Sequence, residues 1–332
     1  MRPKGYWRAC GVISPMQIPR GGEPLISVVI CTRNRAALLS RALTSVVEQA
    51  FSHADYEILV VDNNSTDRTH EIVRQFQNKA SVQYLREEQL GLCMARNTGW
   101  RNAAGRYVAY FDDDAIASPG WLAAVRDGFA SHSSRIGVIG GPVRGIWEKP
   151  RPGWLAEEIV CSLTVIDWGP SDKRLDDISR EWLAGANMAV PKALLVEVGG
   201  FHPWLDRVGN NLLSSGDVFL QKEIMRRGYQ CLYRHAMVIG HLVPASRLNQ
   251  EWFFRRYYWQ GVSDAVMHLI EKSPSPAERI RLALARTASV LQSRQRISSL
   301  FARCDRPDKF AAKCFALIDV GFVSGLLGAA RH

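Results

Sequence analysis

Short apolar runs alternate with amphipathic segments along the first third of the chain. Four runs are apolar enough to predict β-strands, at residues 25–31, 57–62, 81–85 and 107–111. The segments between them place apolar residues at helical spacing, which predicts helices over residues 35–49, from Thr66 onward and over 92–103. Continuous apolar strands separated by helices are typical of a parallel sheet buried on both faces. The pattern therefore predicts an α/β fold, in which ligands bind beyond the carboxyl ends of the strands.

The pattern becomes irregular in the second half of the chain. Residues 142–170 contain four prolines, which predict a long loop-rich insertion. Tryptophan stacks on sugar faces and also fills cores, and core packing is the favoured interpretation for Trp147, Trp154 and Trp168. A helix is predicted over residues 214–227. From Asn249 onward the chain is predicted to be mostly helical, with breaks at 273–276 and near Pro307.

Positive charge is concentrated at the two ends of the chain. The net charge of the 332 residues is +10, of which residues 1–22 contribute +4, residues 241–332 contribute +7 and residues 23–240 contribute −1. We therefore expect a basic N-terminal arm, a nearly neutral body and a basic, mostly helical C-terminal region. A neutral body argues against a nucleic-acid groove running across it. The basic ends either meet an acidic surface such as anionic lipid or are solvated helix faces.

The seven cysteines are scattered along the chain without any Cys-x-x-Cys pair. A zinc site and a disulfide framework are therefore not expected, and reduced, mostly buried thiols fit a cytosolic protein. The basic N-terminus lacks the apolar segment of a signal peptide. The longest apolar run, 315–330, is interrupted by Asp319. As a helix it would reach only ~24 Å against a hydrocarbon core of ~30 Å, so we expect it to pack on the protein or lie in a membrane interface.

Three consecutive aspartates, Asp112–Asp114, follow the fourth predicted strand. Clustered carboxylates repel one another, so such a cluster is costly unless positive charge lies beside it. Carboxylate oxygens suit Mg²⁺ or Mn²⁺, especially where substrate phosphates complete the coordination. The alternative is a solvated turn in which Asp114 or Ser118 caps the following helix. Because Thr32 and Asp62 end two other predicted strands, three separate segments are expected to converge on one crevice.

An ordered series of short motifs continues from about residue 25 to 240. The motifs are VVICTRNR at 28–35, ILVVDNNSTD at 58–67, GLCMARNTG at 91–99, YVAYFDDD at 107–114, GANMA at 185–189, VGGF at 198–201 and SGDVFL at 215–220. In this order and spacing they resemble the family-2 glycosyltransferases, which have the GT-A fold. The resemblance implies a Rossmann-like α/β catalytic domain over 23–240, with a mostly parallel central sheet, followed by a helical C-terminal extension. It also implies transfer of a sugar from a nucleotide-diphosphate donor with inversion at the anomeric carbon.

The resemblance assigns donor-binding roles to matching residues. The residues expected to hold the nucleotide-sugar, a UDP-, GDP- or dTDP-linked donor, are Thr32, Arg33, Asp62, Arg96, Asp112 and Asp113. Asp62 is expected to contact the base, and its alternative role is that of a strand-end cap. Arg96 is expected to help hold the nucleotide, and its alternative is a surface salt bridge.

The resemblance also implies a metal site. Asp114 is the expected direct ligand of Mg²⁺ or Mn²⁺, with Asp112 touching ribose or the metal site and His241 completing the shell. The alternative for His241 is a hydrogen-bonded core histidine. A divalent ion at this place would stabilise the departing diphosphate.

The resemblance places the sugar and acceptor pocket at Gly185, Ala186 and Asn187, and the catalytic base at Asp217. The family commonly carries Glu-Asp where this chain has Gly216-Asp217, so the second carboxylate is retained and the acceptor contacts are less predictable. The alternative for Asp217 is a helix N-terminal residue stabilised by the helix dipole, which is compatible with catalysis.

The Gln-x-x-Arg-Trp motif of chain-extruding synthases is missing, which argues against such a synthase. The acceptor is expected to be a glycan or a lipid-linked precursor in cell-surface polysaccharide biosynthesis. The alternative function is a non-catalytic nucleotide-sugar-binding protein of the same fold. We expect a cytoplasmic enzyme that touches the anionic inner membrane surface and binds no nucleic acid. The residues that favour membrane contact mix aromatic rings with positive charge: Trp252, Arg255, Arg256, Tyr257, Tyr258 and Trp259.

Overall fold

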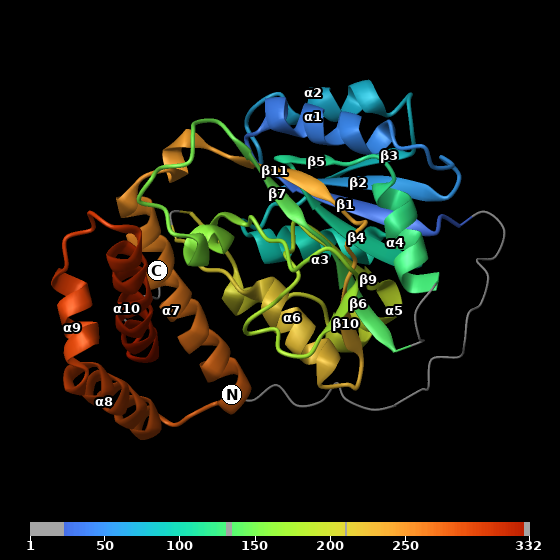
Figure 1. Cartoon of the computed structure of the whole chain (residues 1–332). Helices are drawn as coiled ribbons and strands as arrows, with labels where there is room; N and C mark the ends of the chain where they lie inside the picture. The colour runs from blue at the N-terminus through green and yellow to red at the C-terminus, as the bar shows by residue number, and fades with distance from the viewer. Residues whose placement is uncertain (1–22, 131–134, 210, 329–332) are drawn as a thin grey trace.

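A large mixed sheet forms the centre of the protein, and a small second sheet lies beside it (Figure 1). The structure is a computed structural model that describes residues 23–130, 135–209 and 211–328. The large sheet has the strand order β3-β2-β1-β4-β9-β6-β10-β8. Its strands are β1 (Ile26–Thr32), β2 (Tyr56–Asp62), β3 (Val82–Arg86), β4 (Tyr107–Asp112), β6 (Ile136–Gly140), β8 (Lys173–Leu175), β9 (Asn187–Pro191) and β10 (Gln230–Tyr233).

The first four strands form the parallel half of the sheet that the apolar runs predict. In the register of this half, Val29 of β1 pairs with Leu59 of β2 and with Tyr110 of β4, and all three are buried. The helices that cover the two faces are α1 (Ala36–Val47), α2 (Thr69–Phe76) and α3 (Leu92–Asn102). The apolar side chains of α1 and α2 pack on one face of the sheet, and those of α3 pack on the other. Burial on both faces explains why the strands read as continuous apolar runs.

The predicted α/β fold is confirmed, with small differences at element ends. The second helix begins at Thr69 rather than at Thr66. The Asp67 carboxylate accepts hydrogen bonds from the backbone N–H and the hydroxyl of Thr69, at 3.1 Å and 2.5 Å, which holds the first residue of the helix three positions later than the motif indicates.

The second half of the chain completes the large sheet with mixed pairing. Strand β9 runs antiparallel to both β4 and β6, and β10 runs parallel to β6. The helices of this half are α4 (Trp121–Ala130), α5 (Lys192–Val198) and α6 (Gly216–Met225). Helix α6 lies within the segment 214–227 that helical spacing predicts.

A three-stranded sheet in the order β5-β11-β7 lies beside the carboxyl end of β4. Its strands are β5 (Ala115–Ala117), β7 (Val143–Trp147) and β11 (Ile239–Val243). The predicted domain boundary after residue 240 falls inside β11. Because His241 pairs with Ala115 in this sheet, a residue from late in the chain lies next to the three aspartates.

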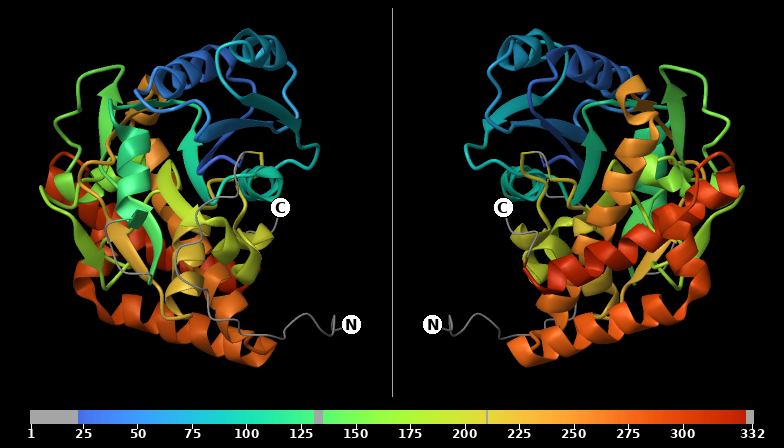
Figure 2. Two further views of the ribbon diagram at one scale, coloured as in Figure 1. Left: turned by 90° about the vertical axis from the view of Figure 1, so that its right-hand side faces the viewer. Right: turned by 90° about the vertical axis from the view of Figure 1, so that its left-hand side faces the viewer.

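Four helices form the C-terminal region: α7 (Gln250–Lys272), α8 (Pro276–Gln292), α9 (Arg294–Phe301) and α10 (Pro307–Leu326). Helices α7 and α10 lie side by side, with α8 and α9 connecting them (Figures 1 and 2). A Cβ atom added to Gly261 of α7 would lie 2.0 Å from the carbonyl oxygen of Ile318 of α10, so glycine permits this close helix contact. The helical prediction and its breaks at 273–276 and near Pro307 are confirmed, whereas the N-terminal arm 1–22 lies outside the described residues.

The loop-rich insertion predicted over 142–170 contains the strand β7 and one 3₁₀ helix. Residues Glu157–Leu163 form a 3₁₀ helix, η1, and two further 3₁₀ turns, η2 (Pro203–Leu205) and η3 (Ala245–Arg247), follow later in the chain. The Trp154 ring packs edge-on against Phe253 and Phe310, with ring centroids 5.6 Å and 4.8 Å away. Core packing is therefore the observed role of this tryptophan, and it joins the insertion to the C-terminal helices.

Candidate active site

Two aspartates and one histidine meet at the carboxyl end of β4. The Nε2 atom of His241 lies 3.2 Å from Oδ1 of Asp114 and 3.9 Å from Oδ2 of Asp112. One ligand atom from each residue lies within 4.8 Å of those from the other two. The backbone N–H of Leu242 donates to the Asp114 carbonyl at 3.0 Å, which holds β11 against the acidic turn. Two carboxylates and an imidazole within this spacing fit one divalent cation.

The middle aspartate faces away from this group. Asp113 accepts a hydrogen bond from the Thr32 hydroxyl at 2.7 Å and pairs with Arg35 at 3.0 Å. The same guanidinium reaches Asp114 at 3.1 Å. Arg35 therefore provides the positive charge that a cluster of carboxylates requires. It lies in the first sequence motif, but its role was not predicted from the sequence.

The acidic residues have strongly different environments. Burial alone would raise the pKa of Asp114, but the hydrogen bond and charge of His241, together with Arg35, lower it to about 2. Burial raises the pKa of Asp113 to about 6 despite the opposing charge of Arg35. Asp114 is therefore ionised across the physiological pH range, as a cation ligand must be. Asp113 instead binds Thr32 and Arg35 inside the protein.

Arg96 is buried and lies between the acidic group and the large core. Its Nη2 atom is 3.4 Å from Oδ1 of Asp112, and its guanidinium lies over the Phe201 ring at 5.2 Å. The alternative of a surface salt bridge does not describe this buried contact. Arg33, by contrast, is exposed and is not among the described residues that line the chamber beside the acidic group.

Asp62 has the local role of a strand-end cap. Its Oδ1 atom accepts from the Ser65 N–H at 2.8 Å, and its Oδ2 atom accepts from the Tyr84 hydroxyl at 2.6 Å. The residue is buried at the end of β2, level with Thr32 of β1 in the sheet register. These contacts fix the carboxylate at the ligand-binding edge of the sheet.

Asp217 lies in the first turn of α6 and faces the start of the GANMA motif at 185–189. Its Oδ2 atom accepts from the Gly185 N–H at 2.9 Å, and its Oδ1 atom accepts from the Val218 N–H at 2.9 Å. Gly185 and Ala186 line the same chamber as Asp217. A Cβ atom at Gly185 would lie 2.6 Å from the Arg96 guanidinium, so a larger residue there would displace this arginine.

Asn187 has a different environment from its two neighbours in the sequence. It is fully buried, accepts from the Trp121 indole N–H at 2.8 Å, and donates to the carbonyls of Pro142 and Met237 at 3.1 Å and 2.6 Å. All its side-chain hydrogen-bonding groups are therefore used to join α4 to two loops. The structure places Asn187 behind the predicted sugar and acceptor pocket rather than in it.

A large open chamber of about 1240 Å³ joins these groups. Its described walls include Arg96, Asp112, Gly185 and Asp217 on one side, and side chains of α7 and α10 on the other. Of the metal group, Asp112 lines the chamber, whereas Asp114 and His241 are buried and are not among its described lining residues. Asp112 and Asp217 therefore border one continuous space. This volume exceeds that of a typical small-molecule pocket and leaves room for both a donor and an acceptor.

Sequence reasoning missed an aspartate that supports the chamber. Asp206 is buried and accepts from the N–H groups of Cys93 and Met94 at 2.8 Å and 3.2 Å. These N–H groups are free at the start of α3, so Asp206 ties the loop before α6 to the helix that carries Arg96. Its position in the sequence, between two unrelated motifs, gives no signal of this contact.

The aromatic residues of α7 pack mainly inside the protein. Tyr257 is buried against Phe315, and the Tyr258 hydroxyl lies 2.6 Å from that of Ser324. The Trp252 ring contacts Phe253 edge-on. The mixture of aromatic rings and arginines in this segment predicts membrane contact, but these contacts contradict that interpretation, because the aromatic rings pack against other parts of the protein. Within the described residues, no helix is both long and apolar enough to cross a membrane.

Comparison with known proteins agrees with the geometry. Residues 27–188 match the family described as Glycosyl transferase family 2. Glycosyltransferase AglE of Haloferax volcanii is 31% identical over 225 residues, which cover 66% of this chain and 67% of that relative. A validoxylamine A glucosyltransferase of Streptomyces hygroscopicus subsp. limoneus is 27% identical over 231 residues, covering 59% of this chain. The matched part spans only half of that relative's length.

The fold agrees with a solved structure as well. Mannosyltransferase PcManGT from Pyrobaculum calidifontis, solved in complex with GDP-Man and Mn²⁺, superposes with a TM-score of 0.59 and 21% sequence identity. The match covers 92% of this chain and 88% of that protein. It establishes the GT-A fold, including the helices that follow the sheet. The chain belongs to family 2 of the glycosyltransferases.

Proposed function

We propose that this glycosyltransferase moves a sugar, with inversion, from a nucleoside-diphosphate donor to a hydroxyl of a glycan or lipid-linked acceptor. The observation that carries the proposal is one chamber that is bordered both by Asp112, a member of the Asp112, Asp114 and His241 group, and by the Asp217 carboxylate. Inverting transfer needs these two functions, charge neutralisation at the leaving group and proton removal from the acceptor, at separate places in one site.

The donor set favours Mn²⁺ or a similar cation over Mg²⁺. Asp112 and Asp114 offer carboxylate oxygens, which suit both ions, whereas the His241 imidazole suits a transition metal better than Mg²⁺. When bound, such an ion would neutralise the diphosphate as its negative charge increases. Thr32 and Arg35 hold Asp113 on the far side of the acidic turn, and this fixes the turn in place.

Asp217 is proposed as the base. It takes the proton from the acceptor hydroxyl while the acceptor oxygen forms its bond to the anomeric carbon. The bond from that carbon to the donor diphosphate breaks at the same time, and the leaving nucleoside diphosphate keeps the electron pair. The Gly185 N–H fixes one carboxylate oxygen at 2.9 Å, which orients the group toward the chamber.

The proposed acceptor belongs to cell-surface polysaccharide biosynthesis, and the enzyme is proposed to act in the cytoplasm, in peripheral contact with anionic membrane. Helices α8 and α9 support this contact better than α7 does. They expose Ile280, Leu284, Leu291 and Phe301, and the basic side chains of Arg281 and Arg294 are exposed nearby. An exposed apolar face with positive charge is suited to an anionic lipid surface.

A donor screen tests the proposal. UDP-, GDP- and dTDP-linked sugars are added in turn, with Mn²⁺ or with EDTA, and the melting temperature and slow donor hydrolysis are measured. A ligand that binds the native state raises its stability with concentration. We expect one nucleotide class to raise the melting temperature only with the metal. If no sugar nucleotide shifts the transition and none is hydrolysed, the proposed function is wrong.

A further inference from the structure

Arg207, Arg247 and Arg256 line the chamber without a carboxylate partner, as does the exposed Arg144 of β7. Among the described residues, no Asp or Glu oxygen lies within 4.0 Å of a side-chain nitrogen of Arg207, Arg247 or Arg256. Their recorded contacts are to neutral groups: Arg207 Nε donates to the Leu213 carbonyl, Arg256 Nη1 donates to the Gln260 side chain, and Arg247 lies over the Trp252 ring. Arg35 and Arg96, the two arginines in contact with the acidic turn, both pair with aspartates.

Arg207, Arg247 and Arg256 lie close enough to one another for their positive charges to repel. Partial desolvation in the chamber, with repulsion from Arg256 and Arg247, lowers the pKa of Arg207 to about 10, although part of this side chain is exposed. Burial also lowers the pKa of Arg247 and of Arg256. Crowded positive charge is retained in a fold where it has a use. The missing partner is an anion that enters the chamber from outside.

The donor alone does not need all three arginines. The diphosphate of a sugar nucleotide carries two negative charges, and a divalent cation already balances them. Cleavage adds one negative charge, which one arginine can neutralise. Arg247 suits that role, because the negative charges of Asp114 and Asp112 act on it directly. The negative charge of Asp217 acts on Arg256, which therefore lies on the acceptor side. Arg207 is repelled by both Arg256 and Arg247.

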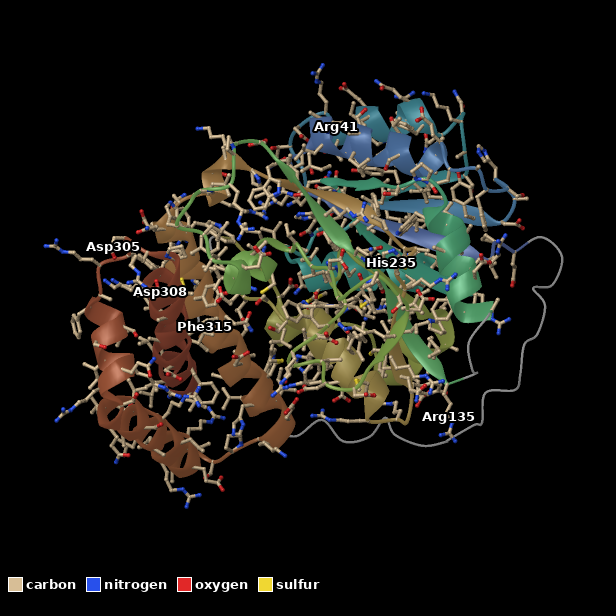
Figure 3. The ribbon with its side chains drawn as sticks, in the orientation of Figure 1. Arg41, Arg135, His235, Asp305, Asp308 and Phe315 are labelled. Carbon is tan, nitrogen blue, oxygen red and sulfur yellow. The ribbon has the colours of Figure 1, made fainter. Side chains whose placement is uncertain are left out.

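An apolar wall adjoins the arginines. Phe315, Ile318 and Phe322 follow one another at helical spacing on α10 and line the same chamber. Phe315, labelled in Figure 3, is 46% exposed, and its ring contacts Tyr257 of α7 edge-on with the centroids 5.7 Å apart. A chamber that joins cations without carboxylate partners to an open apolar wall fits a molecule with an anionic head and a hydrocarbon chain.

We propose that the acceptor is an amphiphile with a phosphate group, bound through its phosphate by Arg207 and Arg256 and through its chain by Phe315, Ile318 and Phe322. The proposal rests on the proposed function, because it places this ligand on the acceptor side of the same site. The phosphate is held beside Asp217. A hydroxyl of the sugar that this phosphate carries therefore reaches the base. The donor keeps the acidic group and Arg247.

Titration calorimetry with hexyl phosphate tests the subsite. The protein is first saturated with Mn²⁺ and with UDP or GDP, whichever binds, so that the donor side is filled. We expect hexyl phosphate to bind this complex, inorganic phosphate to bind it more weakly, and hexanol not to bind. Arg256→Gln and Arg207→Gln should each lower the affinity for hexyl phosphate by about tenfold or more, the usual effect of losing a hydrogen bond to a charged group. Phe322→Ser should lower the affinity for hexyl phosphate but leave the affinity for inorganic phosphate unchanged.

Arg135→Gln is the matched control, since Arg135 is exposed and labelled far from the chamber in Figure 3. The melting temperature separates binding from folding. Loss of an unpaired, crowded cation should leave the ligand-free protein as stable as before or more stable. A lower melting temperature in both arginine variants would assign these residues to the fold and overturn the proposal.

Three other results would also overturn it. They are competition between hexyl phosphate and the nucleotide, unchanged affinity in the arginine variants, and equal affinities for hexyl phosphate and inorganic phosphate. A chain that binds no nucleotide contradicts the proposed function instead. In that case hexyl phosphate titrated into the protein alone still decides the subsite.

Discussion

The Nε2 atom of His241 lies 3.2 Å from Oδ1 of Asp114, although the two residues are in different halves of the chain. The small sheet creates this contact, because β11 pairs with β5 directly after the acidic turn. The sheet register therefore decides whether the metal group exists. A shift of one residue would turn the histidine to the other face of the strand.

The two neighbouring aspartates are expected to respond differently to substitution. Asp114→Asn should abolish the Mn²⁺-dependent part of nucleotide binding and lower transfer at least ~100-fold, because it removes a charged ligand from the cation. Asp113→Asn should keep the Mn²⁺ response, since its oxygens face Thr32 and Arg35. Calorimetry with the nucleoside diphosphate, with Mn²⁺ and with EDTA, measures both. Full turnover of the native protein in excess EDTA would contradict the metal assignment.

The catalytic base is tested by Asp217→Asn. This variant should still bind donor but lose transfer by roughly 10²–10⁴-fold, the usual range for losing a general base. Glu223→Gln on the same helix is the matched control, because Glu223 pairs only with arginines of its own helix end. Donor affinity and transfer rate are measured separately. Near-normal transfer would exclude Asp217 as the base, and loss of donor binding would make it a structural residue.

The parallel half of the fold was predictable because its signal is local. Strands β1, β2 and β4 are buried along nearly their whole length, so the apolar residues appear consecutively in the sequence. The positions of Asp62 and Asp112 at strand ends follow from the same pattern. The mixed half was not predicted, because the short strands β6 to β10 owe their pairing to distant segments.

The site was predictable only as a set of residues. The direction of Asp113, the contacts of Asn187 and the positions of Arg35 and Arg207 depend on tertiary packing, which no motif records. Asp319 is a further example. It interrupts an apolar run, yet it is buried and pairs with Arg286 at 2.6 Å and Arg296 at 3.2 Å. The charge therefore holds α8 and α9 against α10.

Gly91 is expected to be sensitive to the smallest substitution. Its φ of +147° is one that other residues rarely adopt, and an added Cβ atom would lie 2.1 Å from Oδ2 of Asp206. Gly91→Ala should therefore destabilise the protein by roughly 1–3 kcal/mol, the usual cost of a strained backbone. Gly153→Ala is the control, because an added Cβ atom meets no atom within 4 Å there. Chemical denaturation of both variants measures the difference, and equal midpoints would contradict the prediction.

Membrane contact should depend on the outer face of α8. Ile280, Leu284 and Leu291 are 53–64% exposed and lie on one side of this helix at helical spacing. Replacing all three with serine should lower binding to anionic vesicles by at least ~100-fold, since each inserted aliphatic side chain contributes about 1.5–3 kcal/mol. The melting temperature should change little, because the three side chains are exposed.

The test is co-sedimentation with vesicles of phosphatidylcholine, with and without phosphatidylglycerol, at low and high salt. The native protein should sediment only with the anionic vesicles and less at high salt, because Arg281 and Arg294 add an electrostatic part of about 1 kcal/mol each. Val196→Ser, which changes an equally exposed apolar residue on α5, is the matched control. Removing residues 245–332 is a poorer test, because it would also remove Phe253 and Tyr257. The buried core residues Leu155, Ile159 and Leu163, which belong to the same cluster, would then be exposed. Equal recovery of native and triple-serine protein with anionic vesicles would show that α8 does not bind lipid.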